Sequence, residues 1–289
     1  MIAEIPTIIS AWKFLTEKVV YLHSEIGHTL HNCRLCQRLP PVLRPGYSSR
    51  NVNKINTEQH MKNLMKLLLM LVLASSLTLQ AQEKAKPVIS ILGDSYSTFE
   101  GYIPEGNESW YFTVPVKNRT DVVDVKQTWW WKLISEGGYI LGKNDSYSGA
   151  TICFTGYRGE DYSARSFITR LPRVGVADIL LIFGATNDSW ANSPIGEYSY
   201  DNVSREMLYA FRPAMGKLLR EAQNRYPGTR IVFVINSELK PEITGSAIEI
   251  CNHYGVEYIE LHDIDKSHGH PSVKGMEQIK AQILDFLKK

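Results

Sequence analysis

Val88-Ile-Ser-Ile-Leu-Gly-Asp-Ser-Tyr-Ser97 is the stretch from which the architecture of this chain can be worked out. The apolar and β-branched residues from Val88 to Leu92 predict a short buried strand. The strand runs directly into Gly93-Asp94-Ser95, which is typical of a sharp turn. Such a turn can hold a serine hydroxyl out of the core, where an enzyme needs a nucleophile. A plain strand-to-loop turn has the same composition, so the rest of the chain must decide between the two.

A targeting segment precedes this strand. Met61-Lys-Asn-Leu-Met-Lys66 is followed by an apolar run at 67–73 and by small and polar residues up to Ala81. A basic start, a short apolar run and a small terminal residue are the layout of a secretory signal peptide. The apolar run is too short for a comfortable membrane span. We therefore expect residues 61–81 to be a signal peptide and the protein to be secreted or periplasmic, without a stable membrane span after cleavage.

Residues 1–60 are interpreted as a spurious or unstructured N-terminal extension, because a signal peptide begins at a start codon. The alternative is that they are translated and that the apolar run becomes an anchor. The extension contains His28, His31, Cys33 and Cys36. Without a second ligand pair at zinc-finger spacing these residues are a weak metal signal. We expect no metal site.

Residues 82–289 are expected to form a single domain. Residues 1–81 carry nine Lys and Arg and four Asp and Glu; subtracting these from the chain's 32 and 30 leaves 23 basic and 26 acidic side chains. No basic stripe of the kind that nucleic acids require is present, so no nucleic-acid partner is expected. The two cysteines of this part, Cys153 and Cys251, lie in apolar contexts and are predicted to be buried free thiols, with one disulfide as the alternative.

Strand and helix patterns alternate along this domain, which predicts a parallel sheet with helices on both faces. Strands are predicted at 177–183 and 230–235, and their residues 179–183 and 231–235 are apolar throughout, as in strands buried on both sides. Irregular, aromatic-rich sequence at 99–125 is typical of a loop that covers a site. The remaining predicted strands are 88–92, 139–141 and 257–261, and the predicted helices are 127–136, 163–171, 200–226, 242–254 and 272–287.

Polar turns follow several of these strands. Ligands of parallel sheets bind at the carboxyl ends of the strands, so turns at those ends converge on one rim. A neutral serine there needs a base, and three of the four histidines of 82–289 lie at 262–270. Backbone N–H groups and an amide side chain can stabilise a developing oxyanion. The turns are Gly93-Asp94-Ser95, Ser148-Gly149 and Thr186-Asn187-Asp188, with the segment 263–272 after the last strand.

Four blocks of this sequence resemble, in order, those of the SGNH (GDSL-type) hydrolase family. The resemblance implies a flavodoxin-like three-layer α/β/α fold with a central parallel sheet of about five strands, and esterase, lipase or deacetylase activity without a cofactor. It implies that Ser95 is the nucleophile, that His270 is the general base, and that Ser95 N–H, Gly149 N–H and Asn187 form the oxyanion hole. Ala185 departs from the glycine that the family usually has. The blocks are Gly93-Asp94-Ser95-Tyr96-Ser97, Gly149, Asn187-Asp188 and His270-Pro271.

The sequence offers several partners that could orient the catalytic histidine. The family usually has Asp three residues before the histidine, but Ser267 stands three before His270. Asp265 stands three before His268, which lacks the following proline. The His-Pro-x-x-x-Gly run favours His270 as the base. Asp265 is then the expected acid, reaching the imidazole from a different place, with Asp263 or a backbone carbonyl as alternatives.

We therefore expect an exported serine esterase that hydrolyses ester-linked acyl groups, chiefly acetyl, on carbohydrate. The expected partner is a small-molecule or glycan ester. Tryptophan rings pack well against the faces of sugars, but they pack equally well against acyl chains. A lipolytic or thioester acylhydrolase is thus an alternative. A non-catalytic glycan-binding module on the same fold is another, kept open by the absence of Asp at position 267. The residues expected to line the substrate site are Asp94, Tyr96, Trp110, Asp188 and Trp190.

Overall fold

The computed structural model describes residues 59–70, 85–114 and 119–289, and the chain divides into two units, Met1–Glu83 and Lys84–Lys289. In the first unit, residues 59–70 are helical. Most of the predicted extension, with its His and Cys residues, and residues 71–81 of the predicted signal peptide lie outside the described residues. Within the described ranges, no helix is both long and apolar enough to cross a membrane.

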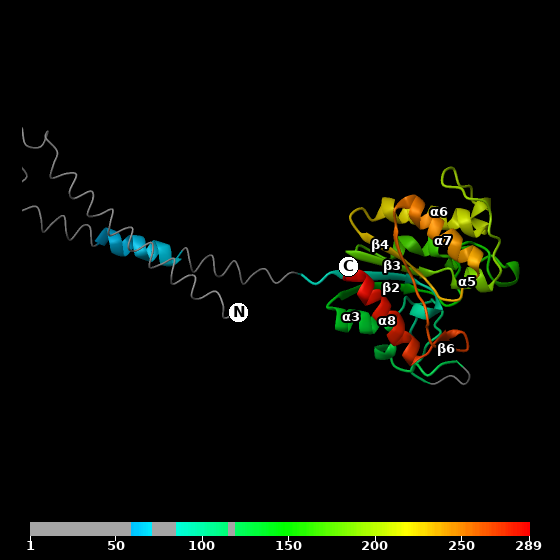
Figure 1. Ribbon diagram of the computed structural model, residues 1–289, viewed down its shortest axis with the longest axis horizontal. Helices are drawn as coiled ribbons and strands as arrows, with labels where there is room; N and C mark the ends of the chain where they lie inside the picture. Colours follow the sequence, from blue (N-terminus) through cyan, green and yellow to red (C-terminus); the bar gives the residue numbers. More distant parts are fainter. Residues whose placement is uncertain (1–58, 71–84, 115–118) are drawn as a thin grey trace, which may run out of the picture. The chain divides into compact units, whose positions relative to one another are not determined.

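The second unit contains a five-stranded, fully parallel sheet with the strand order β2-β1-β3-β4-β5 (Figure 1). This is the flavodoxin-like order, and it confirms the predicted fold class. The strands are β1 (Val88–Gly93), β2 (Ile140–Ser146), β3 (Ile179–Gly184), β4 (Arg230–Ile235) and β5 (Glu257–Glu260).

Helices cover both faces of the sheet, with α3 and α8 on one side and α6 and α7 on the other (Figure 1). Because side chains alternate along a strand, each central strand supplies both cores. In β3, Leu180 and Ile182 join one apolar cluster, while Leu181 and Phe183 join the other. The helices are α3 (Trp129–Gly137), α4 (Phe167–Arg170), α5 (Thr186–Trp190), α6 (Phe211–Arg225), α7 (Pro241–Tyr254) and α8 (Val273–Leu287).

Local signals set the helix ends. The Thr128 side chain accepts the Trp131 N–H at the start of α3, and Gly138 ends that helix in the left-handed conformation with φ 76°. Ser272 caps α8 in the same manner, accepting the Gly275 N–H. These contacts satisfy backbone groups that would otherwise lack partners.

Three predicted elements have clearly different bounds. The helix predicted at 163–171 is α-helical only over Phe167–Arg170, between 3₁₀ turns at Ser163–Arg165 and Leu171–Arg173. The predicted helix at 200–226 begins only at Phe211, because Ala210 is extended and residues 206–209 form a separate 3₁₀ turn. The strand predicted at 139–141 continues to Ser146. Its last residues are polar and so resemble a turn in the sequence, yet Asn144 and Asp145 pair with Ile91 and Leu92 of β1.

The tryptophan run at 129–131 and the two cysteines of the domain are mainly buried. Trp129 and Trp130 are fully buried, whereas Trp131 is half-buried, so the tryptophan run contributes mainly to the core. The Trp129 indole N–H donates to the Tyr96 carbonyl at 3.1 Å, which ties α3 to the turn after β1. Cys153 and Cys251 are buried free thiols, as predicted.

Candidate active site

The site lies where β1 and β3 end side by side. In this strand order the connections leave β1 and β3 in opposite directions, and a crevice opens beyond their carboxyl ends. Ser95 begins a 3₁₀ turn immediately after β1, and Asn187 lies in α5 immediately after β3. His270 comes from a two-stranded antiparallel ribbon formed by β6 (Lys266–Ser267) and β7 (His270–Pro271). The fold thus brings three distant segments together.

The central contact joins His270 to Ser95. The His270 Nε2 atom lies 2.9 Å from the Ser95 Oγ atom, although the two residues are 175 positions apart in sequence. The turn that carries Ser95 is held in shape, because the Asp94 carboxylate accepts the Tyr96 N–H at 3.0 Å. Ser95 is only 2% exposed. A serine hydroxyl in this position can pass its proton to the imidazole.

A backbone carbonyl sets the tautomer of His270. The Nδ1 atom lies 3.3 Å from the His268 carbonyl oxygen. A carbonyl can only accept a hydrogen bond, so Nδ1 carries the proton and Nε2 presents its lone pair to the Ser95 hydroxyl. This is the tautomer that general-base catalysis requires.

The predicted acid, Asp265, does not contact His270. Its carboxylate accepts the Ser272 hydroxyl, and its carbonyl accepts the Ser272 N–H at 3.1 Å, so it secures the start of α8. Asp263 is also occupied elsewhere, since its carboxylate lies 2.9 Å from the His262 Nδ1 atom. Of the three partners considered from the sequence, the backbone carbonyl is the one at Nδ1. Spacing along the chain could not distinguish the three, because it does not show that the two carboxylates bind His262 and Ser272 instead.

The environment of His270 keeps its imidazole neutral. Burial lowers the pKa of His270 to about 4, and the positive charges of Arg119 and Lys266 act in the same direction, while the His268 carbonyl opposes them. Burial disfavours the charged form of any base. The ring is therefore unprotonated at neutral pH and able to accept a proton.

Three aromatic side chains surround His270. The Trp110 indole is stacked on it with ring centroids 3.6 Å apart and planes 9° apart. Tyr96 and Trp190 approach at 5.3 and 5.5 Å. The Tyr96 hydroxyl donates to the Gly269 carbonyl at 2.6 Å and so holds the segment that carries the histidine. Of these three rings, Trp190 is the one with a large exposed area, at 39%.

Candidate hydrogen-bond donors for an oxyanion come from the segments that follow β1, β2 and β3. The backbone N–H groups of Ser95 and Gly149 form no hydrogen bond to any residue that the structure describes. Gly149 has φ 79°, a left-handed conformation that favours glycine. The Asn187 amide is almost fully buried, with its Nδ2 atom 3.0 Å from the Ala150 carbonyl oxygen. The second Nδ2 hydrogen remains available to a ligand.

Comparison with known proteins agrees with this arrangement. Residues 87–287 match the profile of the GDSL-like Lipase/Acylhydrolase family. The chain belongs to this family. It is therefore a hydrolase of ester bonds. No curated protein matches the chain.

Solved structures of two GDSL-like lipases resemble this hydrolase closely. That from Bacteroides ovatus is 57% identical with a TM-score of 0.70, covering 71% of this chain and 99% of the other. That from Bacteroides uniformis is 52% identical with a TM-score of 0.69, covering 71% and 97%. A carbohydrate esterase is similar at 17% identity and a TM-score of 0.52, covering 72% and 70%. At this identity, the similarity to the carbohydrate esterase shows a shared fold and nothing more.

In this GDSL-like hydrolase, two carboxylates expected to line the substrate site are structural. Asp94 and Asp188 are fully buried. Asp188 accepts the N–H groups of Ile152 and Cys153 at 2.8 and 3.0 Å, which fixes the segment after Gly149. Burial raises the pKa of Asp188 to about 6 and that of Asp94 to about 7. Both support the turns rather than face a ligand.

A buried arginine supports the nucleophile turn and was not predicted from the sequence. Arg170 lies 3.5 Å from the Asp145 carboxylate, and its Nη2 atom donates to the Gly93 carbonyl at 3.1 Å. Burial lowers the pKa of Arg170 to about 10. No sequence signal distinguishes Arg170 from a surface arginine, because its burial depends on Asp145, a partner that lies in β2.

Two motif positions also have structural reasons. A Cβ atom at Gly275 would lie 2.0 Å from the Asp265 carbonyl oxygen, so the glycine of His-Pro-x-x-x-Gly allows α8 to approach the histidine segment. Ala185 adopts φ 73° and is fully buried within an apolar core cluster. A glycine avoids the strain of that conformation, which explains the family's usual residue there.

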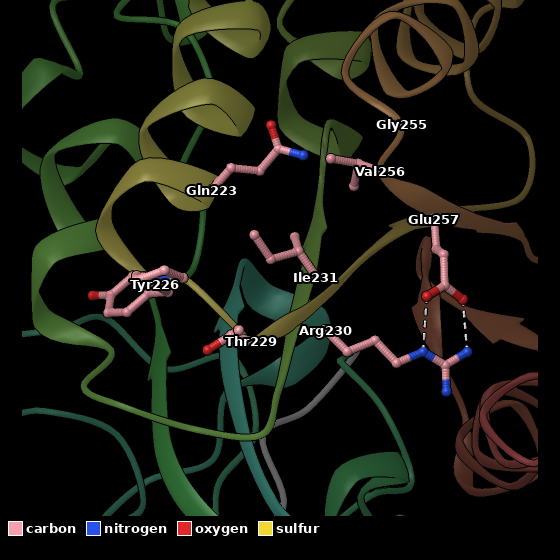
Figure 2. A pocket seen from close by; sticks show the side chains of 10 residues that line it. Gln223, Tyr226, Thr229, Arg230, Ile231, Gly255, Val256 and Glu257 are labelled. Carbon is pink, nitrogen blue, oxygen red and sulfur yellow. Dashed lines mark hydrogen bonds and ion pairs between the residues drawn. The ribbon is translucent and has the colours of Figure 1, made fainter.

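Two hollows lie elsewhere in this hydrolase. One, of about 340 Å³, lies at the amino ends of β4 and β5, beside the ion pair of Arg230 with Glu257 at 2.6 Å (Figure 2). It is at the opposite edge of the sheet from Ser95. The other, of about 510 Å³, is lined by residues 100, 101, 103–109 and 112. The Glu108 carbonyl in that segment accepts the Ser148 N–H at 2.9 Å and links it to the Gly149 turn.

Proposed function

We propose that this chain is an exported serine esterase that removes short acyl groups, chiefly acetyl, from carbohydrate. The observation that carries the catalytic part is the 2.9 Å contact between His270 Nε2 and Ser95 Oγ. It is supported by the tautomer that the His268 carbonyl imposes.

In the proposed mechanism, Ser95 Oγ attacks the ester carbonyl carbon while its proton passes to His270 Nε2. The oxyanion that forms is held by the N–H groups of Ser95 and Gly149 and by Asn187 Nδ2. The C–O bond to the alcohol then breaks, and His270 returns the proton to the leaving oxygen. Water attacks the acyl-enzyme with the same base and releases the carboxylic acid. His268 takes the orienting role of the usual aspartate through its backbone carbonyl.

A small acyl group fits this site best. Ser95, Asn187 and His270 are each at most 5% exposed, and aromatic rings pack around the histidine. An acetyl group needs little space beyond the nucleophile. The exposed Trp190 ring beside His270 offers the flat apolar surface that sugar faces prefer. These two features support a carbohydrate acetyl ester as the substrate.

Export is proposed from the sequence pattern at 61–81 alone. Its test is the N-terminus of the protein recovered outside the cytoplasm after expression of the full chain. A start at Gln82 supports cleavage, whereas a product that keeps residues 61–81 argues against it.

Hydrolysis of nitrophenyl acetate by the full chain tests the mechanism. Ser95→Ala and His270→Ala are expected to reduce kcat by at least about 10³-fold, while His268→Ala, which keeps its backbone carbonyl, retains activity. Labelling by a fluorophosphonate probe should disappear in Ser95→Ala. A wild-type protein that neither labels nor turns over would favour the glycan-binding alternative.

A lipolytic activity is the second candidate, favoured by the two GDSL-like lipases to which the chain is 57% and 52% identical. Nitrophenyl esters of increasing chain length separate the two. Fast turnover of long chains with none of acetate would exclude the acetyl-esterase proposal.

A further inference from the structure

The Asn187 side chain has two hydrogen-bond partners within the protein. Its Nδ2 atom donates to the Ala150 carbonyl at 3.0 Å, and its Oδ1 atom accepts the Tyr157 hydroxyl at 2.8 Å. The Ala150 carbonyl belongs to the segment after Gly149, and Tyr157 belongs to a separate loop. The amide is thus held from two directions.

These two contacts define which way the amide faces. A carbonyl oxygen can only accept, so Nδ2 must face Ala150 and Oδ1 must face Tyr157. The phenol is then the donor. Rotation of the amide by 180° would set Oδ1 against the Ala150 oxygen, where two acceptors repel. One Nδ2 hydrogen is used by Ala150, and the second is free.

We propose that Tyr157 is a positioning residue that holds the Asn187 amide with its free N–H toward the developing oxyanion; this inference rests on the proposed esterase mechanism. Donation to Oδ1 also polarises the amide and strengthens its Nδ2 hydrogens as donors. Tyr157 touches no reacting atom in this role. Its contribution reaches the transition state through Asn187.

The loop that carries Tyr157 is held in a defined shape. Thr155 and Asp161 form a bridge across its base, and the Gly156 N–H donates to the Glu160 carbonyl at 2.8 Å. The Tyr162 ring packs so closely on Gly156 that a Cβ atom there would lie 2.2 Å from it. A loop closed in this way can present the phenol at a fixed position.

The phenol remains a donor over the working pH range. Burial raises the pKa of Tyr157 to about 12, and the negative charges of Asp94 and Asp188 act in the same direction. The hydroxyl therefore keeps its proton. A phenolate could not donate to Oδ1.

The test is a double-mutant cycle in the full chain, with nitrophenyl acetate as substrate. Tyr157→Phe keeps the ring and removes the hydroxyl, and kcat should fall about 10-fold with KM unchanged, the expected loss for one hydrogen bond. Asn187→Ala should reduce kcat by about 10²-fold or more. Because Tyr157 acts through Asn187, adding Tyr157→Phe to Asn187→Ala should cause no further loss.

A matched control is Tyr209→Phe, which removes a hydroxyl that donates to Asp161 in the same loop at 2.9 Å and should leave kcat unchanged. If Tyr157→Phe lowers kcat equally with and without Asn187, or not at all, this inference is overturned while the proposed mechanism stands. If Asn187→Ala itself retains full activity, the oxyanion role and this inference both fall.

Discussion

The imidazole of His270 and the indole of Trp110 are stacked at 3.6 Å, with their planes only 9° apart. Family members usually orient the catalytic histidine with an aspartate, but in this chain the Nδ1 atom meets a backbone carbonyl at 3.3 Å. A neutral carbonyl holds an imidazole less strongly than a carboxylate does. The stacked Trp110 indole therefore contributes more to fixing the plane of the His270 imidazole than it would beside a carboxylate partner.

Trp110→Ala is expected to lower kcat about 10- to 100-fold, because loss of the stack lets the imidazole rotate away from Ser95. Trp110→Phe, which keeps a ring, should lose less. The measurement is nitrophenyl acetate turnover, with Trp131→Phe on α3 as a control expected to keep wild-type kcat. Equal activity in Trp110→Ala and wild type would show that the carbonyl alone suffices.

The pH profile of kcat/KM should have an acid limb near pH 4. Burial lowers the pKa of His270 to about 4, so the ring is neutral and able to take the Ser95 proton above that value and is protonated below it. Activity is thus expected to fall as the pH drops through about 4 and to be flat from 5 to 7. A limb near the ordinary histidine value would contradict the buried, neutral imidazole.

Ser267→Asp should restore a carboxylate partner to His270. Ser267 and His270 are directly paired across the β6–β7 ribbon, so their side chains lie on the same face. A carboxylate there favours the imidazolium and raises the histidine pKa by about 1 to 3 units. The acid limb of the kcat/KM profile should therefore move to higher pH by the same amount, and kcat should rise about 10-fold. Ser267→Asn, which adds bulk without charge, is the control and should leave the limb in place.

Asp94→Asn should change how stability depends on pH. Burial raises the pKa of Asp94 from 3.8 to about 7, so between those values the folded state binds more protons than the unfolded state. Its contribution to stability is therefore lost as pH rises through this window. The asparagine oxygen can still accept the Tyr96 N–H. Urea unfolding at pH 5 and pH 8 measures the free energy of unfolding of both proteins. The stability of Asp94→Asn relative to wild type should be higher at pH 8 than at pH 5. An equal stability difference at the two pH values would refute this prediction.

Arg170→Met should destabilise the fold by about 3 kcal/mol, because the fully buried Asp145 carboxylate loses its buried partner and keeps only the partly exposed Arg173 at 3.3 Å and Lys143 at 3.9 Å. The Gly93 carbonyl also loses a donor just before the nucleophile turn. Arg220→Met is the control, since Arg220 pairs at 3.6 Å with Asp201, which is 91% exposed, and such surface pairs contribute at most about 1 kcal/mol. Denaturant unfolding measures both. Similar losses in the two variants would argue against a special role for the buried pair.

Much of the fold follows from local sequence. Residues 179–183 of β3 and 231–235 of β4 are apolar because both faces of these strands are buried. Thr128 and Ser272 mark helix starts because their oxygens accept backbone N–H groups. Element bounds were missed where a tertiary contact overrides the local pattern. The polar end of β2 is a strand because β1 supplies its hydrogen bonds.

The sequence by itself determined the parallel α/β architecture, the turn that carries Ser95 and the turn that carries Asn187, because strand ends and turn residues are local features. Tertiary structure alone decided the partners: the carbonyl at His270 in place of Asp265, the burial of Arg170 against Asp145, and the donation from Tyr157 to Asn187. Each of these contacts joins side chains or backbone groups whose directions depend on how separate segments pack. Spacing along the chain records which residues are available, whereas a hydrogen bond depends on atoms meeting within about 3 Å at a suitable angle.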